Sequence, residues 1–298
     1  MHTQKEFTPD LLDRFKKLGR GTGTHENYLP WHRVGRSDPS SSGRSHLMLW
    51  KKRQRELLSD GEMTSLLFTT MLNNLIDIRE QFPLQKNDEM HELSEYDIRF
   101  SDKWVPGTVS IFQRLKIRHP RVNGNGRSAL WVPSTDQLLV LKQPDGELEM
   151  LAIAFKPEGL KWTRRTYQLL AAEQAYWAAR SVQWILITPE IFDATAADCL
   201  WRAAPWGLGD TVDLRTIDLA AEVVNECLGY SFTFTLDSLS AVLGNRDFAQ
   251  RSFWQGVWSG SIPMDLRRGW RPHLPVKLLD FASFLDLNPI ARRRSAWI

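Results

Sequence analysis

The chain has 298 residues, 42% of them hydrophobic and 24% charged, and a formal net charge of +3. This composition is typical of a folded soluble protein of about two domains, and no apolar run reaches the length that spans a membrane. A charged N-terminus without an apolar core argues against a secretory signal, and two cysteines exclude a disulfide framework, so we expect a cytoplasmic protein.

The first 46 residues are predicted to form an N-terminal arm. Residues 8–18 have the spacing of a short amphipathic helix, but residues 19–46 are rich in Gly, Ser, Pro and Arg and have no helical or strand period. This segment is too long for a simple connection, so it is either disordered or functional. Basic residues here and just beyond indicate contact with a polyanion, although a solvated surface explains any single cluster equally well. The candidate DNA-binding residues are Arg20, Arg36, Ser42, Arg44, Lys51 and Lys52.

The next part of the chain predicts two short strands, a helix and a longer strand. Residues 47–57 have the pattern of a strand, a basic turn and a second strand, and Ser59 with Asp60 is typical of a helix cap. Glu62 lies in the first turn of that helix, where a glutamate usually does no more than match the helix dipole. The longer strand covers residues 76–84.

Residues 135–157 predict a β-hairpin with charges at its edges. The turn residues Gln143–Glu147 contain Pro, Asp and Gly in the order of a three-residue loop with a glycine bulge. This turn sets a register in which Asp136 faces Ala154, and Lys156 projects from the same face as Asp136. The alternative is that Asp136 caps a turn and Lys156 is a solvated strand end.

Elements on either side of the hairpin complete an α/β core with a mixed sheet. Before it, the weakly patterned residues 85–134 contain one predicted helix, at 109–117. After it, residues 163–181 repeat at helical spacing and residues 184–192 alternate as a strand. The pattern changes near residues 204–210, which indicates a domain boundary.

We therefore predict two domains, 1–204 and 205–298. The second is expected to be small and mainly helical, with one helix at 238–244 that ends in Gly244 and one at 247–262 that Gly260 terminates, followed by a basic, proline-broken segment. Helices followed by such a segment are compatible with a winged-helix module that binds DNA or a partner protein.

Glu62, Asp136 and Lys156 are the residue types that a metal-dependent phosphodiesterase needs. Hydrolysis of a phosphodiester requires a nucleophilic water and neutralisation of charge on the phosphate and the leaving oxygen. Carboxylates that hold Mg²⁺ serve both needs, and a lysine orients the water or steadies the charge. Magnesium keeps several waters, so a small set of carboxylates is enough.

Several short motifs lie between residues 19 and 190. They are GRGTG (19–23), YLPW (28–31), SSGRSH (41–46), LLSDGE (57–62), IDIREQFPL (76–84), STD (134–136), FKP (155–157) and EQAYW (173–177). Together they resemble the TnsA family, the endonuclease subunits of heteromeric bacterial transposases. The resemblance implies a restriction-endonuclease-like fold, with a mixed sheet and flanking helices.

The resemblance also implies roles for particular residues. The acidic residues and the lysine of the family's site fall on Glu62, Asp136 and Lys156, and a further acidic residue falls on Glu173. The periodicity alone would make Glu173 a solvated helix residue. The Phe155 carbonyl takes the place of a backbone metal ligand. The implied cofactor is Mg²⁺, with Mn²⁺ able to substitute.

The partners implied by the resemblance are double-stranded DNA at transposon ends, an integrase-type transposase subunit and an AAA+ ATPase regulator. The family cuts the 5′ ends of the transposon, the integrase-type subunit cuts the 3′ ends, and the regulator binds the C-terminal region. No membrane is involved, and the expected location is the bacterial cytoplasm, at the nucleoid during transposition.

One departure keeps other interpretations open. Many relatives with this fold carry Glu or Gln two residues before the lysine, but this chain has Ala154. We expect weaker organisation of the metal rather than loss of activity, yet a non-catalytic adaptor and an independent restriction-type nuclease remain alternatives. His25, His32 and His46 are expected to be hydrogen-bonding loop residues, since no pair has the helical spacing of metal ligands.

Overall fold

The computed structural model of the protein describes residues 6–35, 38–40, 44–157, 159 and 162–297. The chain forms two compact units: Met1–Met63, Asn74–Leu186 and Trp297 make the first, and Thr64–Asn73 and Ile187–Ala296 make the second. The boundary predicted at residue 204 differs from this division, because it falls inside the helix α5 (Ala194–Gly207). Pro205 and Gly207 of that stretch belong to the last turn of the helix.

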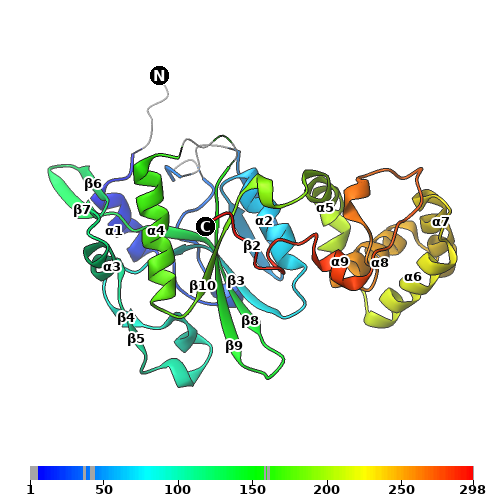
Figure 1. Ribbon diagram of the computed structural model, residues 1–298, viewed down its shortest axis with the longest axis horizontal. Helices are drawn as coiled ribbons and strands as arrows, with labels where there is room; N and C mark the ends of the chain where they lie inside the picture. The colour runs from blue at the N-terminus through cyan, green and yellow to red at the C-terminus, as the bar shows by residue number, and fades with distance from the viewer. Residues whose placement is uncertain (1–5, 36–37, 41–43, 158, 160–161, 298) are drawn as a thin grey trace. The chain divides into compact units, whose positions relative to one another are not determined.

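The first unit is built on a four-stranded sheet in the order β10, β9, β8, β3 (Figure 1). β3 (Leu75–Pro83), β8 (Ser134–Lys142) and β9 (Leu148–Phe155) pair in antiparallel fashion. The helix α4 (Arg164–Ala178) connects β9 to β10 (Gln183–Ile187), as in connections that join parallel strands. Residues 138–141 of β8 are all apolar and buried, because both faces of the sheet are covered. The predicted α/β core is confirmed.

The hairpin of β8 and β9 has the predicted turn and register. Gln143 N–H donates to the Glu147 carbonyl (2.8 Å), and Gly146 N–H donates to the Gln143 carbonyl (2.9 Å). Gly146 has φ = +89°, the conformation that a glycine bulge requires. The ladder that follows keeps the register expected from this turn and brings Asp136 level with Ala154.

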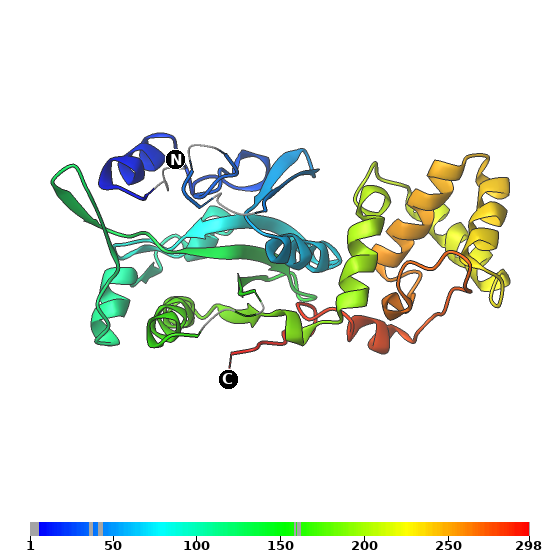
Figure 2. The same cartoon turned by 90° about the horizontal axis from the view of Figure 1, so that it is seen from above.

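The N-terminal arm covers one face of the sheet and α4 covers the other (Figure 2). The arm contains α1 (Pro9–Lys17) and the 3-10 helix η1 (His25–Asn27), and leads into the hairpin of β1 (His46–Trp50) and β2 (Arg53–Leu57). Phe15 and Trp31 of the arm are buried, and their rings meet edge to face at 5.3 Å. The described part of 19–46 is therefore packed on the core, although its sequence has no period.

Residues 85–134 form short elements between β3 and β8. The predicted helix is present as α3 (Thr108–Arg114). The sequence did not predict the remaining elements, which are the ribbon of β4 (Glu89–Met90) and β5 (Trp104–Val105), the ribbon of β6 (Arg121–Gly124) and β7 (Arg127–Leu130), η2 (Glu92–Glu95) and η3 (Ile98–Phe100). A buried ion pair between Arg180 and Glu92 (2.8 Å) anchors this region near the end of α4.

The second unit is helical in the part of the chain that is described. It contains the later turns of α2 (Asp60–Thr70), α5, η4 (Pro189–Ile191), α6 (Leu214–Glu226), α7 (Phe232–Leu243), α8 (Arg246–Ser259), η5 (Leu266–Arg268) and α9 (Phe281–Leu285). α7 and α8 end at Gly244 and Gly260, both left-handed, at the predicted positions. Outside the helices, its described residues pair only at isolated bridges, so no wing hairpin is seen. None of the described helices is long and apolar enough to cross a membrane.

Candidate active site

Glu62 begins the site from the first turn of α2. Ser59 Oγ accepts from the Glu62 N–H (3.2 Å), and Glu62 Oε2 accepts from the Leu58 N–H (2.9 Å). Ser59 therefore caps the helix, and the Glu62 carboxylate binds the backbone of the residue before this cap. The Glu62 side chain is only 8% exposed and reaches the sheet, so it does more than match the helix dipole.

Asp136 and Lys156 meet at the end of the β8–β9 hairpin. Asp136 Oδ2 accepts from the Phe155 N–H at 2.6 Å, and Lys156 Nζ donates to the Phe155 carbonyl at 3.0 Å. Burial lowers the pKa of Lys156, but the nearby carboxylates of Asp136, Glu173 and Glu62 outweigh burial, and its pKa is raised. Lys156 is therefore held as a cation beside the two strand ends.

Gln81 of β3 joins the two carboxylates and was not predicted from the sequence. Its Nε2 donates to Glu62 Oε2 at 3.1 Å and to Asp136 Oδ1 at 3.2 Å. Burial first, and the charge of Asp136 second, raise the pKa of Glu62 to about 8. The sequence signal that could have revealed Gln81 is the run of polar residues within 76–84, a segment whose other residues are typical of a buried strand.

Glu173 of α4 lies at the same site. Its Oε1 accepts from Thr135 Oγ1 (2.8 Å) and from Trp184 Nε1 (3.1 Å). Burial raises its pKa to about 7, against the opposing effect of the Lys156 charge. Asp136, Lys156 and Glu173 line one cavity of about 550 Å³, whose other walls include apolar side chains such as Trp131. The structure thus brings all the predicted catalytic residues into one region.

The residues of the site fit a divalent cation with a sparse protein shell. Glu62 and Asp136 are carboxylates close enough to share one amide, and Phe155, whose N–H binds Asp136, has a carbonyl that accepts from Lys156. Like charges held together in a buried place are relieved by a cation. Among the described residues, no group of three or more His, Cys, Asp or Glu is arranged as a metal site. Mg²⁺ suits such a set, because it keeps several of its waters.

Ala154 is 1% exposed and adds no polar group to the site.

The histidines that were expected to be loop residues lie outside the site. His46 Nε2 lies 2.6 Å from Asp60 Oδ1, and the His25 N–H donates to Asp77 Oδ2 (2.7 Å). His32 is buried, and its ring stacks on Trp131 at 5.6 Å.

The candidate DNA-binding residues have different surroundings. Lys51 and Lys52 form the exposed turn between β1 and β2, with φ of +45° and +62°. The Arg44 side chain is 77% exposed and pairs with Asp60. Arg20 differs, because its side chain is 11% exposed and bonds to Asp38 at 2.8 Å within the arm. Arg36 and Ser42 lie outside the described residues.

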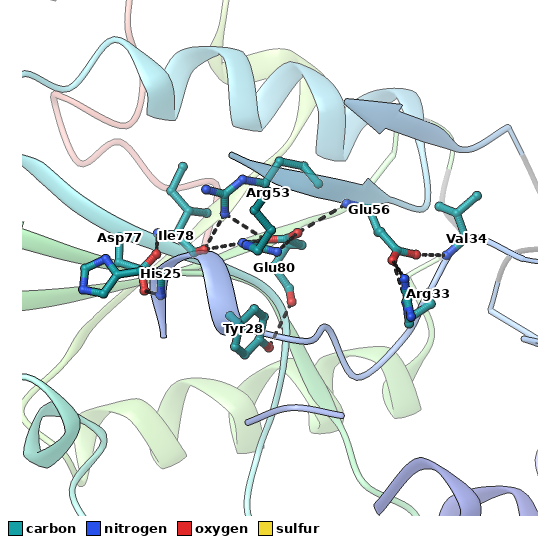
Figure 3. A network of polar contacts seen from close by, with 10 residues as sticks. His25, Tyr28, Arg33, Val34, Arg53, Glu56, Asp77, Ile78 and Glu80 are labelled. Carbon is teal, nitrogen blue, oxygen red and sulfur yellow. Dashed lines mark hydrogen bonds and ion pairs between the residues drawn. The ribbon is translucent and has the colours of Figure 1, made fainter. Parts of the chain in front are cut away.

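A buried polar network ties the arm to the sheet next to the site (Figure 3). Glu80 of β3 is fully buried and accepts two hydrogen bonds of 2.6 Å from the Arg53 guanidinium. The Tyr28 hydroxyl donates to the Glu80 carbonyl at 3.1 Å. Glu56 accepts from Arg33 Nε (2.5 Å) and belongs to the same network through its N–H to Glu80. The arm is thereby fixed to the residue that precedes Gln81.

Comparison with known proteins gives one informative match. No family model matches the chain. Over 184 residues, which are 61% of this chain, the sequence is 34% identical to the transposon Tn7 transposition protein TnsA of Escherichia coli. This part of the chain is similar to TnsA. The match spans 58% of that relative's length, less than two thirds of it. The predicted resemblance is confirmed over this stretch, and the α/β core is consistent with a nuclease fold.

Gly61 offers a test of how tightly the site is packed. A Cβ added there would lie 1.8 Å from Phe155 Cε1, so Gly61→Ala must displace the ring next to the Phe155 carbonyl. We predict a loss of about 1–3 kcal/mol in the free energy of unfolding, although alanine forms helices better than glycine. Chemical denaturation measures this loss.

Gly35→Ala is the matched control, since a Cβ at Gly35 meets nothing within 4 Å. This variant should unfold at the wild-type denaturant concentration. Equal stability of the Gly61→Ala and wild-type proteins would mean that the Phe155 ring is not held in place.

Proposed function

We propose that this chain is a metal-dependent DNA endonuclease subunit of a heteromeric transposase, with a restriction-endonuclease-like catalytic domain, that cuts the 5′ ends of a transposon. One observation carries this proposal: Glu62 and Asp136 share the Gln81 amide, while Lys156 lies at the adjacent strand end. The similarity to a transposition protein favours an enzyme that acts on transposon DNA over other phosphodiesterases.

The chain's own residues would divide the work of phosphodiester hydrolysis. Glu62, Asp136 and the Phe155 carbonyl would hold Mg²⁺, or Mn²⁺ in its place, which supplies Lewis-acid stabilisation of the phosphate oxygens. Lys156 carries a positive charge at the cavity, where it would orient the attacking water and steady the phosphate. Glu173 faces the same cavity and would position Lys156 or accept a proton from the water.

The substrate and partners are proposed from the TnsA-like part of the chain. The substrate is double-stranded DNA at transposon ends, and the partners are an integrase-type transposase that cuts the 3′ ends and an AAA+ ATPase regulator. We assign partner or DNA binding to 205–298, whose α7 and α8 precede an extended basic segment. The expected setting is the bacterial cytoplasm, at the nucleoid.

A second candidate is a non-catalytic adaptor that bridges the transposase and the ATPase. Ala154 favours it, because the strand position beside Asp136 contributes no polar side chain. Against it stand four ionisable groups gathered at one site, Glu62 buried and the others partly buried, since removing such groups from water without a function is costly.

Cleavage of a labelled transposon-end plasmid with Mg²⁺ tests the catalytic assignment. In a mixture with the cognate transposase and ATPase, the wild-type chain should cut the 5′ ends. Asp136→Asn keeps the size of the side chain but removes its charge, so it should lower this cleavage at least about 100-fold while 3′ cleavage continues.

The other outcomes separate the alternatives. Cutting by the chain without partners would indicate an independent nuclease. Intact 3′ cuts without any 5′ cuts in the wild-type mixture would identify an adaptor. Full 5′ cleavage by Asp136→Asn would show that Asp136 is not a catalytic residue.

The exposed lysines of the β1–β2 turn predict a contribution to DNA affinity. Removal of one lysine–phosphate interaction reduces the slope of log K against log salt by about 0.9, so Lys51→Gln with Lys52→Gln should reduce it by up to about 2. Fluorescence anisotropy of duplex DNA over a salt series measures the slope. The matched control is Lys16→Gln with Lys17→Gln on α1, also an exposed lysine pair. Equal slopes for the turn variant and the wild type would place the DNA elsewhere.

A further inference from the structure

The backbone of Gln81 has an unusual conformation for a strand residue. Its φ is +50°, and it is the only non-glycine residue with positive φ inside a β-strand of the described chain. Such a conformation is strained and persists only where the surroundings enforce it. The β3–β8 ladder pairs Glu80 with Gln137 and Phe82 with Thr135, while Gln81 between them has no paired residue in this ladder.

The N-terminal arm supplies hydrogen bonds to β3 at this point. Trp31 N–H donates to the Gln81 carbonyl at 3.2 Å, and the Tyr28 hydroxyl donates to the preceding carbonyl, of Glu80, at 3.1 Å. Tyr28 and Trp31 are both buried. Two successive carbonyls of β3 are therefore bound by the arm, which explains how the left-handed turn at Gln81 is maintained.

The side chain of Gln81 uses its whole amide at the site. Its Nε2 donates to Glu62 and to Asp136, while its Oε1 accepts from Ser134 Oγ at 3.1 Å. Ser134 fixes which end of the amide faces the carboxylates, so both N–H bonds point toward negative charge. Gln81 is 3% exposed, so its amide is buried at the centre of these contacts.

We propose that Gln81 is a positioning residue of the active site, which sets the spacing of Glu62 and Asp136 for a shared divalent cation. This inference rests on the proposed function. An amide suits the task better than a charged group, because it donates to both carboxylates without competing with the cation as a counter-ion. Removal of a side chain that hydrogen-bonds to a metal-binding carboxylate typically weakens metal affinity about 10–100-fold.

The test compares Mn²⁺ affinity, followed by electron paramagnetic resonance, with cleavage and thermal melting. Gln81→Met keeps the length of the side chain and removes its donors. We expect Mn²⁺ binding weakened about 10–100-fold, a higher Mg²⁺ requirement for cleavage, and a Tm close to that of the wild type. The matched control is Gln113→Met on the exposed surface of α3, which should leave all three measurements unchanged.

Gln81→Asn keeps the experiment decisive if the methionine variant does not fold. Asparagine tolerates positive φ well, so this variant should fold. Its shorter amide cannot reach both carboxylates at once, so Mn²⁺ affinity should again fall. Wild-type Mn²⁺ affinity in a folded Gln81 variant would overturn the positioning role while the proposed function stands. A wild-type chain that neither binds Mn²⁺ nor cuts DNA would overturn the proposed function, and the role of Gln81 with it.

Discussion

The carboxylates of Glu62, which is buried, and Asp136, which is partly buried, lie close enough to share the Gln81 amide, and the rest of the site is built around this pair. Protein donors bind the oxygens of both carboxylates. The Leu58 N–H binds Glu62, the Phe155 N–H binds Asp136, and the Gln81 amide binds both. The positive charge of Lys156 lies beside the pair. A buried arrangement of this kind is costly for stability alone, and it is what a cation-binding site requires.

Distant parts of the chain support this pair. The turn after Gln143 sets the hairpin register, which puts Asp136 and Lys156 on one face. The missing side chain of Gly61 lets the start of α2 lie against Phe155. The arm holds β3 through Glu80 and its neighbour, so the network in Figure 3 links the covering layer of the sheet to the active site. Each support comes from a different element, which makes the site sensitive to packing far from it.

The sequence predicts the local features well and the long-range ones poorly. The hairpin turn and the two glycine-ended helices follow from turn chemistry and propensity, which act within a few residues. The register then places Asp136 and Lys156 together. Glu173 is different, because only the resemblance singled it out. The left-handed Gln81 could not be foreseen, since it depends on Trp31, fifty residues earlier in the chain. The boundary expected near residue 204 falls inside α5, whose last turn contains Pro205 and Gly207.

Metal binding by the Glu62–Asp136 pair tests this account most directly. Mn²⁺ would be titrated into the purified chain and into Glu62→Gln, which keeps the shape of the side chain and removes its charge, with Mg²⁺ as competitor. We predict a Mn²⁺ site in the wild-type chain that Mg²⁺ displaces and that Glu62→Gln weakens at least about tenfold, while both proteins melt as folded chains. Equal Mn²⁺ affinity in the two proteins would contradict a metal site built on this pair.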